Sequence, residues 1–357
     1  MTTVGDSPLD AQKLEQFVFR AVDEVGATLN TALVVMGDRL GLYRALAGAG
    51  PLTPAALAAR TDTSERYVRE WLNAQAAGGF VAYHGEDSYS LPPEQAAALC
   101  DEDSPAYLPG LFQNALGSVI DSPRVTEAAR TGAGIGWHEH NHHVHVGCER
   151  LFRPGYKANL VEAWLPALDG VVEKLQRGAR VADVGCGHGA STVLMAEAFP
   201  ASEFTGSDYH EASVETARRR AEEAGVADRI AFEVEPAAAF TGEGYDLVTM
   251  FDCLHDLGDP VGAARHVLET LAPDGTWMIV EPAAGDRVED NLHPVGRAYY
   301  GFSTLLCTPA SLSQDVGLAL GAQAGPARTR QVADDAGFTR FRSAAATPLN
   351  VIYEARP

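Results

Sequence analysis

The sequence predicts an α/β protein in which a parallel sheet with flanking helices follows a mostly helical N-terminal region. Two observations indicate this class. Strand and helix patterns alternate from residue 178 onward, and a glycine-rich turn joins the first of those strands to a helix. In the first 80 positions, apolar residues recur at helical spacing instead. A chain of 357 residues is long enough for two domains.

Composition limits the partners that we expect. The formal net charge is −21, and a surface of this sign repels both nucleic acid and anionic membranes. No apolar stretch approaches the roughly 20 residues that span a bilayer, and the first residues carry no export signal. Five scattered cysteines without a C-x-x-C pair are typical of free thiols. We therefore expect a cytoplasmic protein without a nucleic-acid or membrane partner.

The N-terminal region has the order of a winged helix-turn-helix. A helical pattern covers residues 11–48, a short helix follows the N-cap Thr53, and another begins at Thr63 or Ser64. Residues 80–91 then read as a hairpin. Residues 1–100 hold 12 acids against 7 bases, a net charge of −5. Because a DNA reader normally presents a basic face, this balance favours a dimerisation or substrate-shaping domain over DNA binding.

A histidine-dense stretch lies between two helical patterns, at residues 104–131 and 157–176. It runs from Trp137 to His145. As an extended loop it would present His138, His140 and His142 on one side. Three interpretations remain open: solvated histidines, a lid whose Trp137 and histidines contact substrate, and a metal site built from imidazoles.

The C-terminal half predicts a sheet with two antiparallel closing strands. Parallel strands are expected at 180–184, 203–207, 229–234, 245–251 and 275–281, and helices at 190–199, 211–224 and 261–272. Residues 285–322 break this rhythm and predict a helical cover, whose Tyr299 and Phe302 are candidate substrate contacts. After a helix at 327–336, strands at 338–343 and 348–355 leave no room for a crossover helix, so they should be antiparallel.

The turn Asp183–Gly189 predicts a nucleoside cofactor. Its glycines permit positive φ and close approach of a ligand to the backbone, and a helix N-terminus follows. Asp208 ends the next strand, where a ribose-hydroxyl acceptor belongs. The spacing G-x-G-x-G differs from the dinucleotide fingerprint, and Asp183 is a poor neighbour for a pyrophosphate. An acid there suits the ammonium of an amino-acid tail, as in S-adenosylmethionine.

On these residues, 178–357 resembles the class I S-adenosylmethionine-dependent methyltransferases, whose Rossmann-like sheet has seven strands. The resemblance implies that Asp183 lies near the methionine end and that Gly185, Cys186 and Gly187 lie against the cofactor. It also implies that Asp208 contacts the ribose hydroxyls and that Tyr209 lies beside the adenine. Phe251 and Asp252, at the end of the fourth strand, are further candidate cofactor contacts. This superfamily often reads adenine with an acid after the third strand. Here Pro236 stands near that place, and Glu235 is the candidate substitute.

A second motif, Phe251–Asp259, follows the fourth strand, where α/β sheets place their ligands. A histidine there suits proton removal near neutral pH. The motif is similar to the His-Asp-Trp stretch of the caffeate-type small-molecule O-methyltransferases. That resemblance implies His255 as general base, oriented by Glu281, and an N-terminal dimerisation domain. One departure is Ala327, where the family usually carries a second acid. The domain pairing also resembles actinobacterial winged-helix methyltransferases, often described as regulators.

These observations predict three parts: a winged-helix dimerisation domain (1–100), a helical linker and lid (101–177) and a methyltransferase domain (178–357). The predicted activity is S-adenosylmethionine-dependent methylation of a small molecule, with oxygen as the favoured acceptor, no resident metal and a homodimeric assembly. Two alternatives remain. One is N- or C-methylation, metal-assisted through the histidine stretch, and the other is a winged-helix transcriptional regulator with a cofactor-binding domain.

Overall fold

The computed structural model describes residues 9–357 and divides into two units, residues 1–116 and 117–357. The expected middle part, 101–177, is therefore shared between the two units. No helix within residues 9–357 is both long enough and apolar enough to cross a membrane.

The N-terminal unit has the expected order of helices followed by a hairpin. Its elements are α1 (Ala11–Arg39), α2 (Leu42–Leu46), α3 (Pro54–Thr61), α4 (Glu65–Ala77), β1 (Ala82–Tyr83), β2 (Tyr89–Ser90) and α5 (Pro93–Leu99). Thr53 caps α3, as predicted, by accepting from the amide of Ala56 at 3.2 Å. The single helix expected over 11–48 is wrong, because Gly41 adopts φ 67° and separates α1 from α2.

A mostly helical segment leads into the sheet. It comprises α6 (Pro109–Ile120), α7 (Ser122–Thr131), the 3₁₀ turn η1 (Trp137–Glu139), α8 (His142–Asn159), the π-helical turn η2 (Leu160–Trp164), η3 (Leu165–Ala167) and α9 (Val171–Arg177). The expected helix over 157–176 is therefore three short pieces after α8. The histidine stretch is not an extended loop, since its second half is the first turn of α8.

The C-terminal unit is built on one seven-stranded sheet of order β5-β4-β3-β6-β7-β9-β8. Its strands are β3 (Arg180–Val184), β4 (Glu203–Asp208), β5 (Ile230–Val234), β6 (Tyr245–Phe251), β7 (Leu271–Pro282), β8 (Arg340–Ala346) and β9 (Asn350–Arg356). The first five pair in parallel, and β9 runs antiparallel to both β7 and β8. The predicted antiparallel finish is confirmed.

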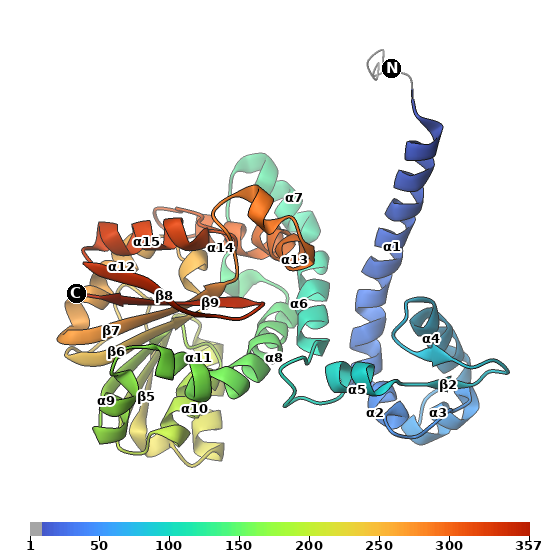
Figure 1. The fold of residues 1–357 in the computed structure, drawn as a ribbon, viewed down its shortest axis with the longest axis horizontal. Helices are drawn as coiled ribbons and strands as arrows, with labels where there is room; N and C mark the ends of the chain where they lie inside the picture. The colour runs from blue at the N-terminus through green and yellow to red at the C-terminus, as the bar shows by residue number, and fades with distance from the viewer. Residues whose placement is uncertain (1–8) are drawn as a thin grey trace. The chain divides into compact units, whose positions relative to one another are not determined.

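Helices cover both faces of this sheet (Figure 1). On one face α10 (Ala190–Ala198), α11 (Glu211–Glu223) and α9 enclose a core with Met195 and Val181. On the other, α12 (Pro260–Thr270) and α15 (Gly325–Ala336) enclose a core with Trp277 and Val267. Both faces are buried, which explains why the parallel strands read as continuous apolar runs.

The predicted helical cover over 285–322 is present after β7. It consists of the 3₁₀ turn η6 (Val288–Asn291), α13 (Pro294–Phe302), the π-helical turn η7 (Ser303–Cys307) and α14 (Thr308–Leu312). Two further 3₁₀ turns, η4 (Ala227–Arg229) and η5 (Leu254–Asp256), precede β5 and follow β6. The cover and η5 together supply side chains to the carboxyl end of the sheet.

Candidate active site

The glycine-rich turn between β3 and α10 has the backbone that the sequence predicts. Gly185, Gly187 and Gly189 all have positive φ, between 52° and 75°. The amide of Gly185 donates to the carbonyl of Ser207 at 2.8 Å, which fastens the turn to β4. A Cβ on Gly185 would lie 2.7 Å from Sγ of Cys253. A side chain at this position would therefore collide with the segment after β6.

Asp183 lies beneath this turn and accepts hydrogen bonds from three hydroxyls. Ser191 and Thr192, in the first turn of α10, donate to its Oδ2 at 2.7 and 2.5 Å, and Thr249 of β6 donates to Oδ1 at 2.9 Å. Burial raises the pKa of this carboxyl, while the hydroxyl donors oppose that rise. The carboxylate thus ties β3, α10 and β6 together.

Asp208 stands at the carboxyl end of β4, beside the glycine turn. Its Oδ2 accepts from the amide of Gly187 at 2.9 Å, and its Oδ1 accepts from the amide of His210 at 2.8 Å. Burial raises the pKa of Asp208 and these amides oppose the rise. Tyr209 is 42% exposed at the next position. A carboxylate fixed in this way, with an aromatic ring beside it, can receive a ribose and an adenine.

The remaining predicted cofactor residues follow β5 and β6. Glu235 is partly exposed, and its carbonyl accepts from the hydroxyl of Ser207 at 3.1 Å. Phe251 is buried, and its ring lies 5.1 Å from that of Tyr156. Cys186 is buried in the turn itself.

Asp252 has a left-handed backbone, with φ 50°, directly after β6. Its carboxyl receives hydrogen bonds from two neutral donors, the Tyr156 hydroxyl at 3.2 Å and the Asn350 amide at 2.8 Å. Burial, assisted by the charge of Glu281, raises the pKa of Asp252 to about 8. Backbone strain of this kind in a non-glycine residue is characteristic of functional sites.

His255 and Glu281 form a close, buried polar pair. Nδ1 of His255 lies 2.5 Å from Oε2 of Glu281, and the other Glu281 oxygen accepts from the amide of Leu254 at 3.1 Å. His255 is 4% exposed and Glu281 is 5% exposed. Because Nδ1 donates to the carboxylate, Nε2 of the neutral imidazole carries the lone pair. The two residues that the resemblance pairs are thus in contact.

The charges around His255 strengthen it as a proton acceptor. Burial lowers the pKa of His255, but the carboxylates of Glu281 and Asp256 outweigh burial, so its pKa lies well above the ordinary value. Burial raises the pKa of Asp256 as well, and the neighbouring His255 opposes that rise. A buried imidazole between two carboxylates holds a transferred proton firmly.

The histidine stretch does not form a cluster of ligands. His140 is buried, with Nδ1 3.1 Å from Oδ2 of Asp121, whereas His138 and His142 are exposed. Within residues 9–357, no group of three potential metal ligands includes a residue of this stretch. The extended, one-sided loop is wrong, because η1 and the first turn of α8 point these side chains in different directions. Trp137 packs edge-on against His145, with ring centroids 5.4 Å apart.

Tyr299 and Phe302 come from α13 in the helical cover. Tyr299 is buried, and its hydroxyl donates to the carbonyl of Leu349 at 2.9 Å. The charges of Asp252 and His255 both act on its pKa, which burial raises. Phe302 packs in the same apolar cluster. Tyr299 therefore lies near Asp252 and His255.

Sequence reasoning missed Tyr156, Asn350, Asp256 and Cys307. Tyr156 and Asn350 reach Asp252 from 96 and 98 positions away in the chain, and no local pattern marks such contacts. Asp256 belongs to the motif Phe251–Asp259, where its position directly after His255 is the one signal that marks it. Asp286 also went unnoticed, although its Oδ1 accepts from the amide of Ala327 at 2.7 Å.

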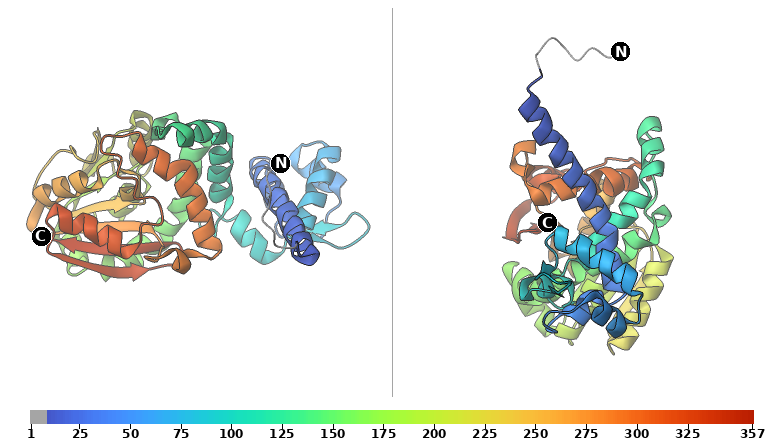
Figure 2. Two further views of the ribbon diagram at one scale, coloured as in Figure 1. Left: turned by 90° about the horizontal axis from the view of Figure 1, so that it is seen from above. Right: turned by 90° about the vertical axis from the view of Figure 1, so that its right-hand side faces the viewer.

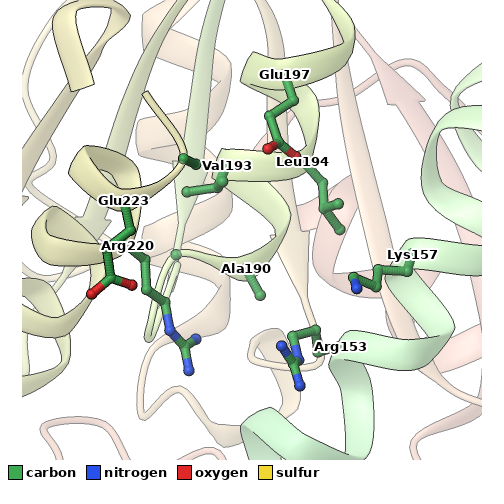
Figure 3. A pocket seen from close by; sticks show the side chains of 10 residues that line it. Arg153, Lys157, Ala190, Val193, Leu194, Glu197, Arg220 and Glu223 are labelled. Atoms are coloured by element: carbon green, nitrogen blue, oxygen red, sulfur yellow. The ribbon is translucent and has the colours of Figure 1, made fainter. Parts of the chain in front are cut away.

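A separate hollow of about 330 Å³ opens between α8, α10 and α11 (Figure 3). Arg153 and Lys157 come from α8, and Arg220 comes from α11. Arg220 also pairs with Glu149 at 3.0 Å. Gly189, at the end of the glycine-rich turn, borders this hollow, but none of the other predicted cofactor or substrate residues does, so we assign it no part in the site.

Comparison with known proteins matches both units of the chain. A model described as a methyltransferase domain matches residues 175–316. Residues 175–316 form a methyltransferase domain. A second model, an Rv2258c-like winged HTH domain, matches residues 28–101. The methyltransferase fold and the N-terminal winged-helix domain, both expected from the sequence, are thereby confirmed.

Individual relatives agree with the methyltransferase domain. The ubiquinone biosynthesis O-methyltransferase of Bordetella avium is 33% identical over 36% of this chain and 52% of its own length. The 27-O-demethylrifamycin SV methyltransferase of Amycolatopsis mediterranei is 31% identical over 50% of this chain and 57% of its own. The chain thus spans only about half the length of these curated relatives.

Solved structures match the fold along nearly the whole chain. Human N-acetylserotonin methyltransferase, solved with S-adenosylmethionine, has a TM-score of 0.68 at 19% identity, covering 99% of both chains. Mitomycin 7-O-methyltransferase has a TM-score of 0.69 at 20% identity, covering 98% of this chain and 100% of its own. At these identities the likeness concerns the fold of the methyltransferase domain and its N-terminal extension.

The role of Asp208 can be tested by binding. Replacing it in Asp208→Asn removes the negative charge that would accept hydrogen bonds from the ribose hydroxyls. Hydrogen bonds to a charged group contribute about 1.5–3 kcal/mol, so S-adenosylmethionine should bind roughly 10–100-fold more weakly by calorimetry. Asp228→Asn, the same change at an exposed position, should leave affinity unaltered. Equal affinities for the two variants would contradict the assignment.

Proposed function

We propose that the protein transfers the methyl group of S-adenosylmethionine to an oxygen atom of a small molecule. The observation that carries this proposal is the His255–Glu281 pair, 2.5 Å apart and buried. The pair stands at the carboxyl ends of β6 and β7. Strand β6 pairs with β3, which carries the cofactor turn, and β3 in turn pairs with β4, which ends at Asp208. A hydroxyl acceptor needs a base as its oxygen attacks, whereas many nitrogen acceptors do not.

The step is an in-line displacement. The acceptor oxygen forms a bond to the methyl carbon as the bond from carbon to sulfur breaks, which releases S-adenosylhomocysteine. The hydroxyl proton passes to Nε2 of His255, and the carboxylate of Glu281 stabilises the resulting imidazolium through Nδ1. Holding acceptor and methyl in line supplies most of the acceleration.

The acceptor belongs to the class of small molecules. The rifamycin relative and the mitomycin enzyme are named as methyltransferases that act on oxygen atoms of such molecules. In this chain, Tyr299 and Phe302 of the cover and the half-buried Trp137 offer aromatic surface, which suits an acceptor with a flat or apolar part. N- and C-methylation remain the alternatives, and the presence of a buried base favours oxygen over a nitrogen acceptor.

The winged-helix unit is proposed to serve assembly and not DNA binding. The arginines on α4 are engaged with acids: Arg66 pairs with Glu70 at 2.6 Å, and Arg69 pairs with Glu65 at 2.7 Å. Arginines held in this way are poorly placed to neutralise phosphates. This supports an enzyme over the alternative of a transcriptional regulator. All five cysteines are free, which supports the proposed cytoplasmic location.

We propose a second copy of this chain as the partner of α1. This long helix is drawn in blue in Figures 1 and 2, and it exposes an apolar stripe within the N-terminal unit. The stripe repeats at helical spacing, with exposed fractions of 48–65% at Val18, Val22, Val25 and Leu29. A contiguous apolar face of this length marks an interaction surface, and the family resemblance implies a homodimer.

The dimer proposal predicts that charge on the stripe separates the copies. In Val22→Glu/Leu29→Glu, two buried carboxylates would face the partner helix, so light scattering after gel filtration should give the mass of a monomer. The matched control is Gln12→Glu/Gln16→Glu, which adds the same charge on the polar side of α1 and should remain dimeric. A wild-type protein that is already monomeric at micromolar concentration would exclude the proposal.

The base can be tested by removing the imidazole. His255→Ala should lower turnover by roughly 10²-fold or more, because the acceptor proton has no destination. Affinity for S-adenosylmethionine should stay near that of the wild type, since His255 serves the acceptor. Turnover is followed as release of S-adenosylhomocysteine, and affinity by calorimetry.

His84→Gln, an exposed change in the winged-helix hairpin, is the control for losing a histidine and should leave turnover unchanged. If His255→Ala keeps full activity, the acceptor needs no base, and O-methylation through His255 is wrong.

A further inference from the structure

Three potential metal ligands meet beside the proposed base. His255, Asp256 and Cys307 each offer one ligand atom, and these atoms all lie within 4.8 Å of one another. Within residues 9–357, this is the group of three potential ligand side chains that lie close enough together to hold one metal ion. His255 and Asp256 come from the 3₁₀ turn η5, and Cys307 comes from the π-helical turn η7 of the cover. In the proposed methyl transfer Asp256 acts only through its charge beside His255, and Cys307 has no role.

We propose that His255, Asp256 and Cys307 form a binding site for zinc, and that zinc there inhibits the enzyme. The site would be regulatory, since the metal occupies the imidazole nitrogen that the acceptor proton requires. The inhibitory part of this inference rests on the proposed function, whereas the binding part stands on the three side chains alone.

The orientation of His255 fits a metal ligand. Zinc-bound histidines almost always donate their other ring N–H to a carboxylate or carbonyl group, which fixes the tautomer and aims the lone pair. Glu281 accepts from Nδ1 at 2.5 Å and so leaves Nε2 available. The arrangement that prepares Nε2 to take a proton from an acceptor equally prepares it to bind a cation.

Asp256 supplies a carboxylate oxygen that is ready to bind. Its Oδ1 lies 3.3 Å from Nε2 of His255. That atom is buried and accepts no hydrogen bond from the described residues. With bonds of 2.0–2.3 Å, the ligand atoms of a tetrahedral zinc site lie about 3.3–3.7 Å apart. Nε2 of His255 and Oδ1 of Asp256 thus already have the separation that zinc requires. Because all three ligand atoms lie within 4.8 Å of one another, a shift of about 1 Å is enough to bring the sulfur of Cys307 to the same separation.

Cys307 makes the site selective for a borderline-soft metal. Its thiol is buried, at the last residue of η7, and π-helical turns are frequent at functional sites. Thiolate and imidazole ligands favour zinc over magnesium or calcium, which prefer oxygen. On binding, zinc replaces the thiol proton, which leaves to solvent. Three protein ligands leave a fourth position open for water.

Occupancy by zinc and base catalysis exclude each other. A metal bound to Nε2 takes the lone pair that would receive the acceptor proton, so the zinc-bound enzyme should lose turnover. Chelation should restore it, because nothing covalent has changed. A net charge of −21 raises the local concentration of cations around the protein.

Binding is tested on the full-length protein with metal alone. Zinc is titrated calorimetrically into protein freed of metal by a chelator, and cobalt is added separately to look for a sulfur-to-cobalt charge-transfer band. We expect one zinc per chain and a band that requires Cys307. Cys307→Ser should weaken zinc binding at least about 10–100-fold, the loss that follows when even a partner of a zinc ligand is removed. Cys100→Ser, another free cysteine, should bind normally.

Inhibition is tested with the same proteins. Cys307→Ser should keep wild-type turnover in chelator and stay active at zinc concentrations that silence the wild type and Cys100→Ser. Asp256→Asn provides a second binding variant, should the serine variant fail to fold. No zinc bound by the wild type, or unchanged binding in Cys307→Ser, would overturn the site. If zinc binds as expected but His255→Ala retains full turnover, the proposed base fails and the metal site stands.

Discussion

The hydrogen bond between His255 and Glu281 is the interaction on which the site depends. It joins the turn after β6 to the end of β7, two neighbouring parallel strands. The constraint behind it is topological, because parallel strands bring all their carboxyl ends to one edge of the sheet. The glycine turn follows β3 and Asp208 ends β4, so the cofactor residues and the base share that edge without any long loop to carry them there.

Buried polar contacts hold this edge in register. Asp183 binds hydroxyls from α10 and β6, and Asp252 is held by Tyr156 of α8 and Asn350 of β9. Each carboxylate is satisfied by neutral donors, so its burial costs less than that of an isolated charge. The left-handed backbone of Asp252 turns the chain from β6 into the segment that carries His255. Rigid strand ends therefore position groups that a flexible loop would leave loose.

Much of this could be predicted because the signals are local. Strands β3 and β6 have the predicted bounds, since apolar runs and flanking glycines lie within a few residues of each other. His255 and Glu281 could be paired through the family resemblance, because each lies close to the carboxyl end of a predicted strand. Contacts between distant segments could not be predicted, as Tyr156 and Asn350 show. The prediction for the histidine stretch was wrong for another reason. The alternation of histidines suggested an extended loop, but a helix begins within the stretch, where the Asn141 side chain accepts from the amide of His143 at 3.0 Å. No sequence pattern predicts the π-helical turn η7, which brings Cys307 close to His255.

The most direct test of the central claim is transfer of an isotope-labelled methyl group. The protein is incubated with methyl-labelled S-adenosylmethionine and a metabolite extract of its host, and the labelled product is identified by mass spectrometry and NMR. We expect a small-molecule product whose new methyl group is bonded to oxygen, formed by the wild type and strongly reduced in Glu281→Gln. A methyl group on carbon or nitrogen, or equal product from Glu281→Gln, would contradict it.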